Sequence, residues 1–167
     1  SLTLDKSAAK RVLVSEGIST PGFKKVERLE DLEGLTLRYP LFAKLCYEGS
    51  SKGVRLDSKV WDLPSLKKKT GWLLETYRSP VLVEEFIQGP EFTVGILGNE
   101  TPSVLGVMQI EIKGVSPSEA IYSLEVKREW EEKVRYLCPP PIDASLLMKI
   151  EEVALQSYKA LECRDVS

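Results

Sequence analysis

The chain has 167 residues, of which 43% are hydrophobic and 29% charged, proportions that exclude a mainly disordered protein and suit one domain or two small lobes. Its formal charge of −2 disfavours a nucleic-acid-binding protein, and no apolar run approaches the length of a membrane span. The absence of histidine excludes Ser-His-Asp and Cys-His nucleophile systems, so any catalysis must use lysine, arginine, carboxylates, hydroxyls and backbone amides.

The first third of the chain predicts a helix, a strand and a glycine-rich loop. Residues 3–16 carry apolar side chains at helical spacing, and Thr3 is the expected N-terminal cap. Residues 41–45 predict a short strand. The small residues at 48–53 then predict the tip of a hairpin, which continues into an extended segment at 54–56.

The middle of the chain predicts a second helix and three strands. Residues 62–77 predict the helix, because a proline is tolerated in its first turn. The apolar run at 81–87 predicts a buried strand that ends in charged residues. Residues 91–97 alternate apolar and polar side chains, and a turn separates them from a partner strand at 103–112.

The last third predicts one long helix after an irregular stretch. Residues 113–141 are rich in glycine and proline, with a candidate strand at 121–126. Residues 143–162 have the clearest helical pattern, capped by Asp143, and another strand is expected to start at Cys163. Together the elements predict a mixed α+β fold with antiparallel hairpins in two lobes.

The loop at 48–53 is the first candidate for ligand binding. Its glycines let backbone N–H groups converge on an anion, its serines add hydroxyl donors, and Lys44 on the preceding strand supplies an ammonium group. The loop is not a Walker motif, which needs a different spacing and a following helix. On this pattern alone, an ordinary flexible hairpin tip is the alternative interpretation.

The strand–turn–strand crossing that follows is the second candidate. Backbone groups of Phe86 and Ile87 are able to bond an adenine edge, and Glu91 is able to accept hydrogen bonds from ribose hydroxyls, as acidic residues do in dinucleotide folds. The alternative is a pair of neighbouring strands with solvated glutamates at their ends. Lys6 and Lys127 are further candidates, and the alternative for each is an ordinary solvent-facing lysine.

In their order and spacing, these segments resemble the ATP-grasp family and, within it, the D-alanine–D-alanine ligases. Residues 4–10 and 17–21 resemble the family's first helix and the loop after it. Residues 40–54 resemble its lysine strand and phosphate loop, and residues 83–94 its adenine hinge and ribose-binding turn. Residues 125–127 resemble the segment with a lysine near the phosphates.

The resemblance implies an α+β ATP-grasp fold with ATP between two lobes. Residues 20–89 are expected to form the small lobe, and residues 1–19 with 90–167 part of a large lobe that is incomplete. Lys127 is the expected catalytic residue, near the γ-phosphate. The expected ATP-binding residues are Lys6, Lys44, Gly49, Ser50, Ser51, Gly53, Glu84, Glu85, Phe86, Ile87, Glu91 and Lys127.

The chemistry that the resemblance implies is phosphorylation of a carboxylate by ATP, followed by attack of an amine on the acyl phosphate, in the synthesis of peptidoglycan precursors. The implied cofactors are ATP and Mg²⁺, and the partners are small amino acids. The family's metal-binding carboxylates are expected downstream of Ser167. The 167-residue chain is therefore expected to show no catalytic turnover by itself. Lys52 departs from the small apolar residue usual in the phosphate loop.

Several alternatives stay open beside this interpretation. The chain could be a nucleotide-binding module without ligase activity, a ligase for other carboxylates and amines, or an interaction domain in which the glycine loop is only a turn. The incomplete lobe is expected to expose a sheet edge, which favours aggregation or a homodimer. Three widely spaced cysteines favour reduced thiols in a cytoplasmic protein.

Overall fold

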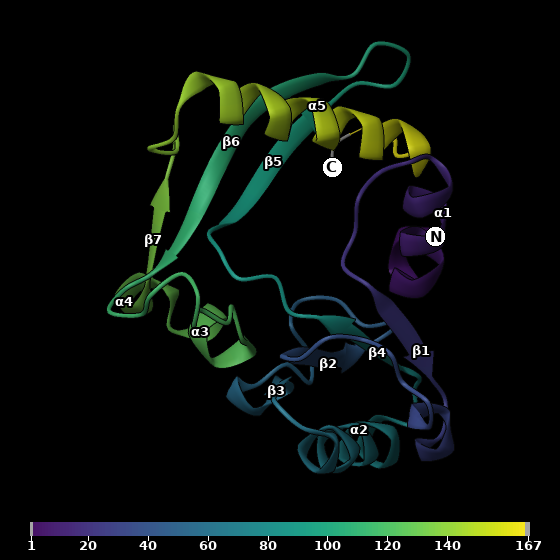
Figure 1. Ribbon diagram of the computed structural model, residues 1–167. Helices are drawn as coiled ribbons and strands as arrows, with labels where there is room; N and C mark the ends of the chain where they lie inside the picture. The colour runs from purple at the N-terminus through teal and green to yellow at the C-terminus, as the bar shows by residue number, and fades with distance from the viewer. Residues whose placement is uncertain (1, 166–167) are drawn as a thin grey trace. The chain divides into compact units, whose positions relative to one another are not determined.

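The computed structural model describes residues 2–165, and its contacts divide the chain into two compact units (Figure 1). Unit 1 consists of Ser1–Arg11, Thr20–Ile87 and Ile121–Arg128, and unit 2 of Val12–Ser19, Gln88–Ala120 and Glu129–Ser167. This division differs from the lobes expected from the sequence, which assign the N-terminal segment and residues 121–128 to the large lobe. Backbone hydrogen bonds attach both segments to unit 1: the N–H of Lys6 donates to Cys46 O at 3.1 Å, and the N–H of Leu124 donates to Val54 O at 3.5 Å.

Unit 1 is built on an antiparallel four-stranded sheet of strand order β1-β4-β2-β3. Its elements in chain order are η1 (Leu2–Leu4), α1 (Lys6–Ser15, which continues into unit 2), β1 (Phe23–Val26), η2 (Leu29–Leu32), β2 (Leu41–Leu45), η3 (Leu56–Ser58), β3 (Lys59–Val60), α2 (Leu63–Tyr77), β4 (Val81–Glu85) and α3 (Leu124–Arg128).

The predicted second helix and the lysine-bearing strand are confirmed as α2 and β2. α2 begins after Asp62, whose carboxylate accepts from the backbone N–H of Ser65 at 2.7 Å, so the cap satisfies one of the free donors of the first turn. The helix covers one face of the sheet (Figure 1). Leu66 and Leu73 of α2 are fully buried in a core with the apolar residues of β2 and β4.

The register of the sheet decides which side chains lie on the face opposite this core. Phe42 of β2 pairs with Glu84 of β4 on one side and with Lys59 of β3 on the other. Residues directly opposite each other in paired strands lie on the same face, and alternate residues along a strand share a face. Phe42, Lys44, Lys59 and Glu84 therefore share the face that α2 does not cover.

Three local predictions in unit 1 are wrong. The strand-like segment expected at 54–56 pairs with no strand in the described part of the chain: it leads directly into η3, which begins at Leu56, and β2 pairs instead with β3. The strand expected at 121–126 is replaced by an irregular stretch and α3. The cap of α1 is Asp5 rather than Thr3, because the Asp5 carboxylate accepts from the backbone N–H groups of Ser7 and Ala8, each at 3.0 Å.

Unit 2 contains an antiparallel three-stranded sheet of order β5-β6-β7, with α5 packed across β5 and β6 (Figure 1). Its elements are β5 (Glu91–Leu97), β6 (Ser103–Ile112), α4 (Trp130–Lys133), β7 (Val134–Leu137) and α5 (Ala144–Ala160). The hydroxyl of Tyr158 on α5 donates to Gly98 O at 2.7 Å, which ties the helix to the β5–β6 turn.

The two strands predicted for the hairpin of unit 2 and the capped helix after Asp143 are confirmed. β7 lies in the stretch that the sequence predicts to be irregular, and it forms because it pairs with β6. Residues 163–165 do not form the expected strand, and residues 166–167 lie outside the described residues.

We expect the cap at Asp5 to make stability depend on acid pH. The backbone N–H of Ala8, followed by the Ser7 hydroxyl and the Cys46 thiol, lowers the pKa of Asp5 from 3.8 to about 2 against the opposing effect of burial. Because the folded pKa is lower than the unfolded one, the stabilisation is complete above about pH 5 and is lost as pH falls through 3.8 toward 2.

The measurement is urea unfolding of Asp5→Asn beside the unmodified chain between pH 6 and pH 3, with Glu16→Gln as an exposed control. The difference in unfolding free energy between Asp5→Asn and the unmodified chain should shrink toward acid pH. A difference that is the same at every pH would contradict the prediction.

Candidate functional site

Three lysines and one glutamate form a half-buried ionic cluster in unit 1. Glu84 uses both carboxylate oxygens: Oε1 accepts from Lys44 Nζ of β2, and Oε2 lies 3.0 Å from Lys10 Nζ of α1. The side chains of Glu84 and Lys10 are 12% and 11% exposed, and that of Lys44 is 25% exposed. Lys6, one helical turn before Lys10, directs its ammonium group to the backbone carbonyl of Glu48, at the start of the glycine loop.

Burial and mutual repulsion act on the charges of this cluster. Burial lowers the pKa of Lys6, and the positive charge of Lys44 lowers it further. Burial also lowers the pKa of Lys10, although Glu84 opposes this effect. For Glu84, burial raises the pKa, but Lys44 and Lys10 outweigh it and hold the pKa below its usual value.

Glu84 is therefore an anion at neutral pH, and it neutralises only one of the three lysine charges of the cluster. A surplus of cationic groups that are partly removed from water stabilises a bound anion more strongly than exposed lysines do. The cluster is suited to the phosphates of a small ligand.

The glycine loop that follows β2 contains three residues with left-handed backbone conformation. Ser50, Ser51 and Gly53 all have positive φ, at 51°, 58° and 76°. A left-handed residue beside a right-handed one turns successive backbone N–H groups toward one side, and such nests bind anions. In this loop the N–H of Lys52 donates to Gly49 O at 3.1 Å, so that donor is already used within the loop. Lys52, the residue that departs from the expected pattern, forms an ion pair with Glu48 at 3.1 Å.

The segment that carries Lys127 packs against this loop within unit 1. The hydroxyl of Ser51 donates to Tyr122 O at 3.0 Å. Lys127 lies on α3, and its Nζ lies 4.6 Å from the centroid of the Tyr122 ring. The helix that replaces the expected strand therefore joins the loop and the predicted catalytic lysine in one unit.

The hinge residues after β4 separate into two groups. Phe86 packs on Phe42 with ring centroids 5.9 Å apart, and Lys59 Nζ lies 4.3 Å from the Phe86 centroid, so these residues border the charged face. Glu85 pairs in register with Leu41, on the other face, and its carboxylate accepts from the backbone N–H of Arg38 at 3.0 Å. Ile87 is largely exposed.

Unit 1 thus contains all of the predicted ATP-binding residues except Glu91, which begins β5 in unit 2 opposite Ile110. The cluster also contains Lys10, for which the sequence pattern alone predicts no role. Lys10 follows Lys6 by four residues, and this spacing on a helix places both ammonium groups on one face. That spacing is the sequence signal that could have identified it.

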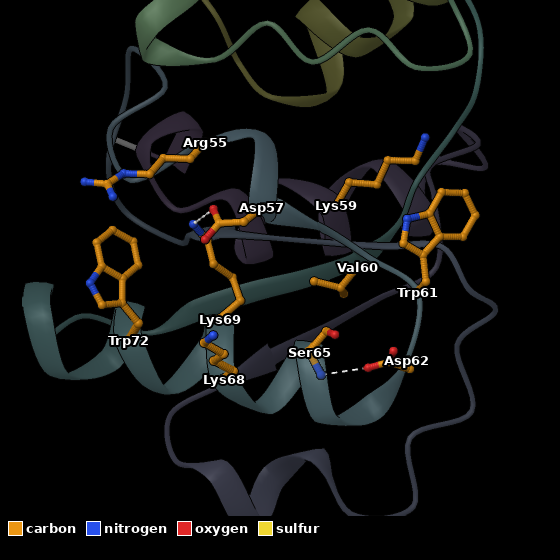
Figure 2. Close-up of a pocket in the computed structure, with 10 residues that line it drawn as sticks. All are labelled: Arg55, Asp57, Lys59, Val60, Trp61, Asp62, Ser65, Lys68, Lys69 and Trp72. Carbon is orange, nitrogen blue, oxygen red and sulfur yellow. Dashed lines mark hydrogen bonds and ion pairs between the residues drawn. The ribbon is translucent and has the colours of Figure 1, made fainter.

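A separate cavity of about 430 Å³ lies between η3, β3 and α2 (Figure 2). None of the predicted site residues lines it. The buried Lys69 donates to Asp57 at 2.5 Å and lies 4.6 Å from the Trp72 ring, while Arg55 lies 4.7 Å from the same ring. Asp62, the second carboxylate in this cavity, caps α2. These internal pairs stabilise the junction between η3 and α2.

Residues 2–165 contain no group of three or more histidine, cysteine, aspartate or glutamate side chains that could hold a metal ion. These residues therefore supply no all-protein cage for a metal ion, and Mg²⁺ at a nucleotide would take most of its ligands from phosphate and water oxygens. Within the same residues, no helix is both long enough and apolar enough to cross a membrane.

Comparison with protein families gives a match over most of the chain. Residues 12–167 match the family model described as D-ala D-ala ligase C-terminus. A D-alanine–D-alanine ligase from Carboxydothermus hydrogenoformans is 34% identical over 172 residues, which cover 98% of this chain and 52% of that protein. The chain spans about half the length of the curated relatives it matches.

Solved structures give the same half-length coverage. The VanG D-Ala:D-Ser ligase from Enterococcus faecalis superposes with a TM-score of 0.77 at 29% identity, over 99% of this chain and 47% of that one. A D-alanine–D-alanine ligase from Bacillus anthracis complexed with ATP superposes with a TM-score of 0.75 over 99% of this chain and 48% of that one. At 24% identity, this second likeness concerns the fold alone.

Proposed function

Because the chain belongs to the D-Ala-D-Ala ligase C-terminal family and has its α+β ATP-grasp fold, we propose that it is the ATP-binding portion of an ATP-dependent carboxylate–amine ligase. The observation that carries the proposal is the cluster of Lys6, Lys10 and Lys44 around the single carboxylate of Glu84, next to the left-handed glycine loop. Both features suit a triphosphate. Lys44, Glu84 and the glycine loop lie within residues 12–167, which match the family model, whereas Lys6 and Lys10 precede that segment.

In this proposal, Lys6 and Lys44 neutralise the phosphates, and the backbone N–H groups of residues 49–53 together with the Ser50 and Ser51 hydroxyls close over them. The Ser51 hydroxyl and the Lys52 N–H would exchange their present acceptors, Tyr122 O and Gly49 O, for phosphate oxygens. Lys127 approaches the γ-phosphate. Positioned cations and backbone donors of this kind supply most of the catalysis in phosphoryl transfer, because the charge of the transferred group is spread over its oxygens. This is compatible with a chain that contains no histidine.

The hinge and the β5 start supply the remaining proposed contacts. We assign the adenine to Glu84, Phe86 and Ile87, and the ribose hydroxyls to Glu91. The carboxylates of the two hinge glutamates are already engaged, that of Glu85 by Arg38 and that of Glu84 by Lys44 and Lys10, so the backbone of the hinge is the proposed contact for the adenine edge.

For the whole ligase we propose acyl-phosphate formation followed by attack of an amine, with D-alanine as the first substrate to test. A carboxylate oxygen attacks the γ-phosphorus and ADP leaves. The amine nitrogen then attacks the acyl carbon, and inorganic phosphate leaves as the new C–N bond forms. Bound Mg²⁺ would screen the phosphates in such a ligase. We expect this chain alone to release no ADP with D-alanine and Mg²⁺.

Calorimetric titration of the chain with ATP tests the proposal. We expect saturable binding of ATP and ADP, and weaker binding of GTP, because the proposed hinge contacts are specific for the adenine edge. The absence of binding at millimolar ATP by a chain that is folded by circular dichroism would overturn the proposed function. Equal affinity for GTP would overturn the adenine assignment while leaving the phosphate site in place.

A further inference from the structure

We propose that Lys10 is a positioning residue that anchors Glu84 as an anion, so that Lys44 is able to leave Glu84 for the phosphates of a bound nucleotide. This inference rests on the proposed nucleotide-binding function and deepens it. In this role Lys10 is the second partner of the Glu84 carboxylate, beside Lys44, and it does not contact the nucleotide.

The two partners of Glu84 differ in how firmly they are held. Lys10 reaches Glu84 Oε2 at 3.0 Å from α1, and its Nζ also lies 5.2 Å from the Phe23 ring centroid. Phe23 is the β1 residue directly opposite Glu84 in the sheet, so Lys10 is fixed between two neighbouring positions of one face. Lys44 holds the other oxygen and is about twice as exposed as Lys10. Lys44 is therefore the partner that a ligand is able to reach.

The second partner matters because Glu84 is buried. A buried carboxylate that loses its only counter-charge must be left unpaired or take up a proton, and both are unfavourable. With Lys10 in place, Glu84 keeps one ion pair when the Lys44 ammonium moves to a phosphate oxygen. Without Lys10, Glu84 would retain Lys44 and compete with the phosphate for it.

The charged groups around Glu84 make the direction of the pH effect clear. α1 contributes Lys6 and Lys10 and β2 contributes Lys44, while β1 contributes the uncharged Phe23. On the β3 side, Lys59 lies beyond Phe42 in the register. Because these charged neighbours are all cations, removal of Lys10 raises the pKa of Glu84. As pH falls, Glu84 then takes up a proton from solvent and releases Lys44.

The test is ATP titration of Lys10→Met and Lys10→Arg at pH 8 and pH 6, with the exposed Lys67→Met as the control for loss of one lysine charge in unit 1. Lys10→Met should weaken binding by about tenfold or more at pH 8, and part of the loss should be recovered at pH 6. Lys10→Arg should bind like the unmodified chain. Lys67→Met should change the affinity by less than about twofold at either pH.

A double-mutant cycle with Glu84→Gln separates positioning from simple charge. In the Glu84→Gln background no carboxylate holds Lys44, so Lys10→Met should weaken binding by less than about threefold. An equal loss in both backgrounds, or a loss in Lys10→Met that does not change with pH, would overturn the proposal. Either result would mean that Lys10 only adds positive charge or packing.

A measurement without nucleotide keeps the inference independent of the proposed function. ¹³C NMR titration of the Glu84 carboxyl group should give a higher midpoint in Lys10→Met than in the unmodified chain. An unchanged midpoint would overturn the role of Lys10 even if ATP binds. A raised midpoint in a chain that does not bind ATP would support the anchoring of Glu84 and reject the proposed function alone.

Discussion

Replacement of Lys44 by methionine should weaken ATP binding by about 10- to 100-fold, the loss expected for one charge-assisted hydrogen bond of about 1.5–3 kcal/mol. Of the two cations that contact Glu84, the Lys44 ammonium is the less buried. Lys44 projects from β2, a central strand of the sheet, so its position is fixed. A phosphate that replaces Glu84 as the partner of Lys44 therefore meets a positioned charge. Methionine keeps the unbranched side chain up to the ε position and removes the charge.

Folding should be affected far less than binding in Lys44→Met, because Glu84 keeps its pair with Lys10. Calorimetry with ATP and thermal unfolding by circular dichroism would measure the two effects separately, with Lys67→Met as the control for one lost surface lysine. Lys44→Arg should recover part of the affinity, since the charge returns with a different geometry. An affinity unchanged in Lys44→Met would contradict the phosphate role of this residue.

Elements whose signal is local are the ones that the sequence predicts well. Asp62 and Asp143 each precede a periodic apolar run, and both cap the helix that follows. The alternation at 91–97 and 103–112 gives the hairpin of unit 2 because a turn directly joins its strands. In these cases the residues that decide the structure are neighbours in the chain.

Elements that depend on distant partners are the ones that the sequence does not predict. The pairing of Lys10 with Glu84 joins residues from α1 and β4. The spacing of Lys6 and Lys10 places both on one helix face, but no local pattern identifies Glu84 as the partner. The segment at 121–126 has the β-branched and aromatic residues typical of a strand, yet it leads into α3 beside the glycine loop, to which Tyr122 is hydrogen-bonded. Tertiary contacts decide such segments more strongly than propensity does.

The glycine loop also depends on residues distant in the sequence, because core side chains pack against Gly53. We therefore expect Gly53→Ala to cost about 2–4 kcal/mol of folding free energy. Gly53 has a φ of 76°, and a Cβ at this position would lie 3.1 Å from Leu73 Cδ2 and 3.2 Å from Leu45 Cδ1. Both leucines belong to the core beneath the sheet and are almost fully buried. The substitution therefore combines left-handed strain with a clash against side chains that cannot move into solvent.

Gly34→Ala is the matched control, because Gly34 also has a positive φ, of 65°, and nothing lies within 4 Å of the point that an added methyl group would occupy. It should cost about 1 kcal/mol, the left-handed strain alone.

Leu73→Ala should cost about 2–5 kcal/mol by itself, but it removes the atom nearest to the added methyl group of Gly53→Ala. The double variant should therefore be more stable than the sum of the two single losses predicts, by about 1 kcal/mol. Urea unfolding of the four variants beside the unmodified chain measures these losses. Equal losses in Gly53→Ala and Gly34→Ala, or strict additivity with Leu73→Ala, would show that the core does not hold the loop in its anion-binding conformation.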